Sequence, residues 1–111
     1  MSELVQKDVT IIYGDAHINV TYKLRVKQDE VINLRLQPEK NPKSGTDFES
    51  LDIDLIGEGE NAKWLNRTLN ANSSAEQKAI PVHDQEPGEY KYTVRVPGVG
   101  VIDPRVTVQP K

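Results

Sequence analysis

The chain has 111 residues, a length that suits one hydrophobic core and is short for two. Its 17 acidic and 14 basic residues give a net charge of -3, which argues against binding to nucleic acid or to anionic membranes, because such proteins usually carry a basic excess. The absence of cysteine excludes disulfides, thiolate metal sites and thiol nucleophiles within this chain. We therefore predict a single domain over residues 1–111 that binds neither nucleic acid nor membrane.

The segment from Met1 to Asp8 has no apolar run and no small-residue cleavage site. Such a segment is neither a signal peptide nor a membrane anchor. We accordingly expect a cytoplasmic protein, and we leave open a secreted domain whose leader has been removed.

Three strands are predicted in the first third of the chain. Residues 9–13 form a β-rich run that stops at the Gly14-Asp15 turn signal. Residues 17–27 alternate throughout, which predicts one long strand. Its inward side chains are Ile18, Val20, Tyr22, Leu24 and Val26. A third strand over residues 32–37 ends at Pro38, which lacks a backbone donor.

The middle of the chain is less regular. Residues 38–47 carry two prolines, a glycine and charges, which predicts a solvated loop, and we expect Phe48 to dock this loop onto the core. Residues 51–55 alternate as a fourth strand with Asp52 and Asp54 outward. For residues 60–74 the apolar spacing fits a two-turn helix or an irregular strand, and we favour an irregular strand or connection.

The last third contains the clearest alternation. Residues 77–83 hold a short apolar run broken by Pro81, which is typical of an edge strand or of a strand interrupted by a bulge. After the Pro87-Gly88 turn, apolar and charged residues alternate as far as Val96, with Tyr90, Tyr92, Val94 and Val96 on the inward side. The closing strand, residues 105–109, has Val106 and Val108 inward.

Short strands separated by turns, without a long amphipathic helix, are typical of β-sandwiches and barrels. We predict an all-β, single-domain antiparallel β-sandwich of about seven to eight strands. Its interior is formed by the alternate residues of each strand.

Near the C-terminus the chain reads Pro87-Gly88-Glu89-Tyr90-Lys91-Tyr92 and then Val106-Thr107-Val108. This pattern resembles the cupredoxin-like family, in which a Pro-Gly-x-Tyr-x-Tyr strand pairs with a final valine-rich strand. The resemblance covers about the last quarter of the chain. Immunoglobulin-like and fibronectin-like sandwiches carry a similar Gly-x-Tyr-x-Tyr strand, so a cupredoxin-like and an immunoglobulin-like Greek key both remain open.

The resemblance also implies where copper ligands would lie. The thiolate of copper-binding members falls near Val94 and the following histidine near Pro97, and neither residue can bind copper. The sole methionine is Met1. The resemblance therefore implies a member without the copper ligands and without a cofactor, and a degenerate metal or redox carrier is kept as an alternative.

Other catalytic or metal sites have weak support in the sequence. His17 and His83, with Asp15 or Asp84, lack the local spacing of a zinc site. No serine lies in a Gly-x-Ser-x-Gly elbow. Asp52 and Asp54 share one face of a strand, as the carboxylate pairs of glycosidases can, but solvated strands also produce such pairs. We predict no catalytic residue, no metal ligand and no enzyme.

The most distinctive surface feature is a set of cations at outward strand positions. These residues are Lys23, Arg25, Lys27, Arg35, Lys91 and Arg95. If their strands are neighbours, they form one basic face on an acidic protein, suited to docking an acidic partner protein. A solvated face is the alternative. We therefore hypothesise a non-enzymatic interaction or ligand-binding module whose partner is another protein.

Two further hypotheses concern Trp64 and a strand edge. The single tryptophan could stack on a sugar in a carbohydrate-binding domain, or fill the core between the sheets. An open edge at residues 77–82 could pair with a subunit of a larger assembly. The sequence does not fix the oligomeric state.

Overall fold

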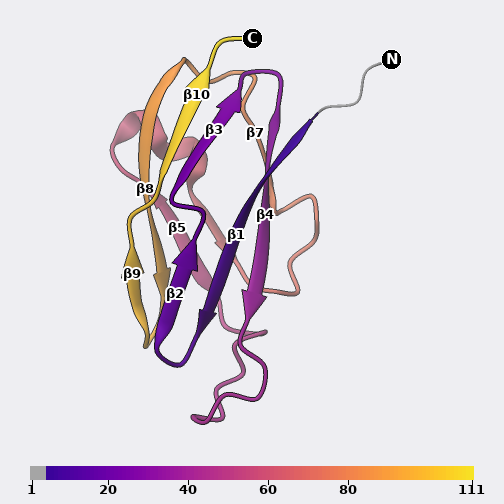
Figure 1. Cartoon of the computed structure of the whole chain (residues 1–111), viewed down its shortest axis with the longest axis vertical. Helices are drawn as coiled ribbons and strands as arrows, with labels where there is room; N and C mark the ends of the chain where they lie inside the picture. The colour runs from indigo at the N-terminus through magenta and orange to yellow at the C-terminus, as the bar shows by residue number, and fades with distance from the viewer. Residues whose placement is uncertain (1–4) are drawn as a thin grey trace.

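The computed structural model describes residues 5–111, and their fold is all-β (Figure 1). Ten strands and one short 3-10 helix occur in this part of the chain. They are β1 (Gln6–Gly14), β2 (His17–Val20), β3 (Lys23–Lys27), β4 (Val31–Pro38), β5 (Ile53–Gly57), η1 (Glu60–Leu65), β6 (Arg67–Leu69), β7 (Ala79–Pro81), β8 (Gly88–Val96), β9 (Gly100–Ile102) and β10 (Arg105–Gln109).

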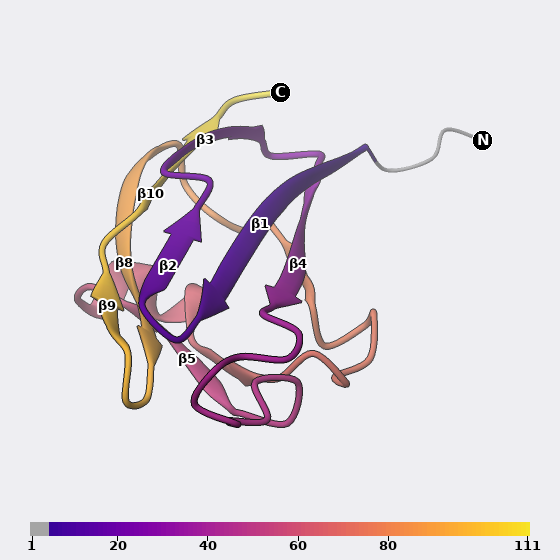
Figure 2. The same cartoon turned by 60° about the horizontal axis from the view of Figure 1, so that its bottom comes forward.

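The strands form two stacked sheets (Figures 1 and 2). One sheet has the order β2-β1-β4-β7, and the other has the order β3-β10-β8-β5-β6, with β9 paired to β8. Both sheets are mixed, because β4 runs parallel to β1 and β10 runs parallel to β3. The expected purely antiparallel arrangement is therefore wrong for these two pairings. Side-chain alternation is the same in parallel and antiparallel strands, so it does not reveal strand direction.

The predicted long strand over residues 17–27 is in fact two strands in different sheets. β2 pairs with β1, the chain crosses at Thr21 and Tyr22, and β3 then pairs with β10. The Thr21 amide donates to the Thr10 carbonyl at 3.2 Å, and the Thr10 amide donates to the Thr21 hydroxyl oxygen, also at 3.2 Å. The crossing leaves Tyr22 47% exposed, contrary to its predicted inward position. The apolar alternation continues through the crossing, which is why the sequence conceals it.

The core lies between the two sheets and draws on both. In β8 the predicted inward residues Tyr92, Val94 and Val96 are at most 2% exposed, and Tyr90 is partly buried against the same core. Val106 and Val108 of β10 are buried as predicted. The alternation in these two strands thus correctly identified the buried side.

The segment over residues 60–74 contains a 3-10 helix, η1, and the short strand β6, rather than only an irregular strand. Ala62 and Leu65 are three residues apart and therefore share one face of a helix with three residues per turn. Both are buried. A 3-10 helix of six residues is too short for its apolar spacing to show an α-helical period.

The long loop after β4 begins where Pro38 was expected to end the strand, and Phe48 anchors it. Phe48 is 3% exposed, its ring meets Tyr13 edge to face at 6.2 Å, and its carbonyl accepts a 3.2 Å hydrogen bond from the Tyr13 hydroxyl. Both predictions for this loop are confirmed. Of the two alternatives for residues 77–83, the structure shows the edge strand, because β7 (Ala79–Pro81) lies at the edge of its sheet.

No helix within residues 5–111 is long and apolar enough to cross a membrane. Residues 1–4 lie outside the described residues. Part of the prediction that the segment from Met1 to Asp8 is neither a signal peptide nor a membrane anchor concerns these four residues.

Candidate functional site: a basic face on β3, β10 and β8

Three cations stand in one row across three neighbouring strands. Arg105 of β10 is in register with Lys23 of β3 on one side and with Lys91 of β8 on the other. Their sequence neighbours Leu24, Tyr90 and Val106 point toward the core, so all three cations project from the outer side of the sheet. Because adjacent strands lie about 4.8 Å apart, the row spans about 10 Å at the backbone.

Two more cations extend this row along β3. Arg25 and Lys27 alternate with buried Leu24 and Val26, and both are exposed. We define the basic face as Lys23, Arg25, Lys27, Lys91 and Arg105. Within the described residues no carboxylate lies within 4 Å of the first four, whereas Arg105 Nη1 is 3.4 Å from Glu89 Oε1.

Sequence reasoning placed Lys23, Arg25, Lys27 and Lys91 on outward positions but missed Arg105. The alternation with Val106 and Val108 was sufficient to place Arg105 outward. Its importance depends on strand order, since β10 lies between β3 and β8 and joins their charges into one surface. Strand order is not encoded in the local alternation.

Arg35 does not belong to this face. It lies on β4 in the other sheet, where its Nη1 is 3.3 Å from Asp8 Oδ2. The Asn33 side-chain amide also bonds to Asp8 at 3.1 Å, and the two hydrogen bonds, that from Asn33 above all, lower the pKa of Asp8. The single basic face suggested by the sequence is therefore divided between two sheets.

Arg95 lies on the same sheet as the basic face but is neutralised locally. Its Nη2 donates to Asp54 Oδ2 at 2.5 Å, and Thr68 Oγ1 donates to Asp54 Oδ1 at 2.9 Å. The Arg95 hydrogen bond, followed by that from Thr68, lowers the pKa of Asp54. Asp52 accepts a 2.9 Å hydrogen bond from the Asn70 side chain. Both carboxylates of the Asp52–Asp54 pair are thus held by neighbouring polar groups.

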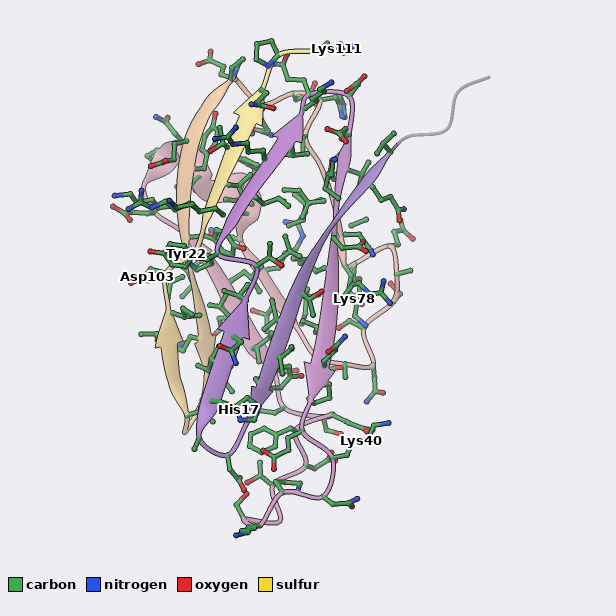
Figure 3. All side chains as sticks on the ribbon, viewed as in Figure 1. His17, Tyr22, Lys40, Lys78, Asp103 and Lys111 are labelled. Atoms are coloured by element: carbon green, nitrogen blue, oxygen red, sulfur yellow. The ribbon has the colours of Figure 1, made fainter. Side chains whose placement is uncertain are left out.

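The two histidines have separate surroundings. His17 Nδ1 is 3.9 Å from Glu39 Oε1 at the end of the molecule where β2 begins, and His83 Nε2 is 3.0 Å from Asp84 Oδ2 (Figure 3 labels His17). Among residues 5–111 no three His, Cys, Asp or Glu side chains form a cluster that could hold a metal ion. Val94, at the position of the copper thiolate in the resemblance, is fully buried.

Trp64 is partly buried against the core and meets the Tyr90 ring edge to face, with centroids 5.2 Å apart. Its indole Nε1 is buried and has no hydrogen-bond partner in the described structure. This packing agrees with the core interpretation of Trp64. Sugar stacking by this residue stays a prediction.

No family model matches this chain, and a search of the curated proteins finds no similar protein.

Proposed function

We propose that this protein is a non-enzymatic interaction module that docks an acidic partner protein through its basic face. The carrying observation is the in-register row Lys23–Arg105–Lys91 on a chain of net charge -3. A local basic surface on an acidic protein orients an acidic partner while the remaining surface repels it.

The charge balance within the basic face supports this proposal. In the part of the chain that the structure describes, Arg105 alone of its five cations has a carboxylate within 4 Å, that of Glu89, so a positive excess remains for a partner. Arg95 and Arg35 are instead paired with Asp54 and Asp8. Among residues 5–111, Lys23, Arg25, Lys27 and Lys91 form no ion pair within 4 Å, so their charges are not offset by a direct pair.

We also infer that the two sheets form a Greek-key sandwich of the cupredoxin-like or immunoglobulin-like kind that lacks the copper ligands. The antiparallel pairing of β8, which carries the Pro-Gly-x-Tyr-x-Tyr motif, with the valine-rich β10 supports this inference.

The docking proposal is tested with poly-L-glutamate as an acidic probe. We expect chemical-shift changes concentrated on β3, β10 and β8, and affinity that falls steeply between about 0.1 M and about 1 M salt, where the screening length shrinks from about 10 Å to about 3 Å. The variant Lys23→Glu/Lys91→Glu should bind about tenfold more weakly.

The matched control is Lys40→Glu/Lys43→Glu, which changes the net charge equally in the loop after β4. Both lysines are exposed, and Figure 3 shows Lys40 near the end of the molecule opposite the C-terminal end of β3. This control should bind nearly as well as the unchanged protein. Equal weakening by both double variants would show that only net charge matters and would refute a localised site.

A further inference from the structure

β3 is an edge strand, and half of its backbone faces away from its only partner strand in the described structure. The Arg105 amide donates to the Tyr22 carbonyl at 2.8 Å, and the Gln28 amide donates to the Gln109 carbonyl at 3.0 Å. In a parallel ladder alternate residues bond to the same neighbour, so the even-numbered residues of this segment bond to β10. The backbone groups of Lys23 and Arg25 therefore point toward the open side.

The open stretch is limited at both ends. At its C-terminal end the Lys27 amide donates to Glu30 Oε1 at 2.7 Å, and the Lys27 carbonyl accepts from the Glu30 amide at 2.9 Å. At its N-terminal end Thr21 is bonded to Thr10 of β1. Within the described residues, the main-chain donors and acceptors of Lys23 and Arg25 are thus left open.

The side chains at this edge are cationic at every second residue. Lys23, Arg25 and Lys27 lie about 7 Å apart along the strand on the outer side of the sheet. An added strand would place its own outward side chains directly opposite them. A second copy paired antiparallel through β3 would set cations against cations, which is unfavourable.

We propose that the acidic partner binds by strand addition: an extended segment with acidic residues at alternate positions pairs with the open edge of β3. Its main chain bonds to Lys23 and Arg25, and its acidic side chains face Lys23, Arg25 and Lys27. The intervening residues of the segment face the buried side of β3, where Leu24 and Val26 lie, and are apolar. This inference rests on the proposed docking function and specifies the form of the partner.

The probe is the peptide Thr-Glu-Val-Glu-Val-Glu-Thr, compared with Thr-Val-Glu-Glu-Glu-Val-Thr, which has the same composition and charge. We expect the alternating peptide to bind about tenfold more tightly, because only its acidic groups match the spacing of the cations. Equal binding by the two peptides would contradict strand addition.

Backbone N-methylation tests the hydrogen bonds without changing charge. In an antiparallel addition the peptide residues opposite Lys23 and Arg25 donate to β3, whereas in a parallel addition the flanking residues donate. We compare one peptide methylated at the glutamate amides with another methylated at the valine amides. We expect one of the two to bind about tenfold or more weakly than the parent peptide, and the other to bind like the parent. The set that matters reports the strand direction.

Amide hydrogen exchange gives an independent readout on the unchanged protein. Peptide binding should slow exchange at Lys23 and Arg25, while Leu24 and Val26 are already bonded to β10. If both methylated peptides bind like the parent and the Lys23 and Arg25 amides stay unprotected, strand addition is wrong. Docking through charge still stands in that case if Lys23→Glu/Lys91→Glu weakens poly-L-glutamate binding. If that double variant has no effect, the docking function itself fails.

Discussion

Arg95 of β8 and Asp54 of β5 lie directly opposite each other in adjacent antiparallel strands and form an ion pair with an Nη2–Oδ2 distance of 2.5 Å. Thr68 of β6 completes the row by donating to the other carboxylate oxygen of Asp54. The pair therefore ties three strands together on the outer side of their sheet. It also removes Arg95 from the positive charge available to a partner.

This pair predicts a pH dependence of stability. Its hydrogen bonds hold the pKa of Asp54 below the usual 3.8, so their contribution is present above that value and is lost as the pH falls through the lower pKa of the folded state. Asp54→Asn should lower the free energy of unfolding by about 0.5–1 kcal/mol at neutral pH. Urea titrations at several pH values should show the difference from wild type vanish in acid; a constant difference would contradict the assignment.

Gly57, the last residue of β5, is required for close packing of η1. A Cβ at this position would lie 1.8 Å from the Ala62 carbonyl oxygen, and backbone cannot move aside as a flexible side chain can. We expect Gly57→Ala to destabilise the fold by at least about 2 kcal/mol in thermal or urea unfolding.

The control for this steric argument is Gly45→Ala in the loop after β4. Gly45 has φ +76° but open space around its Cβ direction. Its substitution should cost only the conformational penalty of about 1 kcal/mol. A Gly57→Ala variant no less stable than Gly45→Ala would show that η1 can shift at little cost.

Features set by neighbouring residues in the chain could be predicted from the sequence, and features set by contacts between distant segments could not. Local alternation predicted the buried residues of β8 and β10, and the prolines and glycines predicted where β4 ends and the long loop begins. The crossing at Tyr22 and the parallel pairing of β1 with β4 are set by contacts between distant segments, which the local pattern does not contain. The same holds for the candidate site. The alternation within each strand placed Lys23 and Lys91 on the outer side of the sheet, whereas Arg105 joins them only because β10 lies between β3 and β8.

The Tyr13 hydroxyl holds the long loop at its Phe48 anchor. Tyr13 is fully buried, and removal of the hydroxyl in Tyr13→Phe would leave the Phe48 carbonyl without this donor. We expect a loss of about 1–2 kcal/mol in urea unfolding at neutral pH.

The same residue predicts behaviour in alkali. Burial, and secondarily the charge of Glu49, raises the pKa of Tyr13 to about 12, above the usual 10.0. Stability from the protonated hydroxyl is complete below pH 10 and is lost as the pH rises toward 12. Urea unfolding of Tyr13→Phe should therefore show a weaker decline over this interval than wild type. Parallel declines would argue against ionisation of Tyr13 as a cause.

Trp64 distinguishes a core role from a sugar-stacking role. Trp64→Phe keeps an aromatic ring beside Tyr90 and removes the buried Nε1 donor that has no partner, so its stability should stay within about 1 kcal/mol of wild type. Trp64→Ala should lose about 2–3 kcal/mol through lost packing. An alanine variant of unchanged stability, together with quenching of Trp64 fluorescence by glycans, would favour the carbohydrate-binding hypothesis instead.

Glu30 is the only buried charged residue in the described structure, and it closes the turn between β3 and β4. Its Oε1 accepts from the Lys27 amide at 2.7 Å, and its Oε2 lies 3.7 Å from Lys7 Nζ on β1, so one side chain links β3 to the opposite sheet. Glu30→Ala removes the acceptor and leaves the Lys27 amide unpaired, with an expected loss of about 1–3 kcal/mol in urea unfolding.

Glu30→Gln is the matched variant, because its amide oxygen can still accept from Lys27 while the charge facing Lys7 is removed. If the hydrogen bond carries most of the effect, as the 2.7 Å and 3.7 Å distances indicate, Glu30→Gln should retain more than half of the stability that Glu30→Ala loses. Amide exchange at Lys27 should accelerate in Glu30→Ala and remain slow in Glu30→Gln. Equal losses in the two variants would instead assign the stabilisation to the charge, and the C-terminal limit of the open edge of β3 would then depend on Lys7.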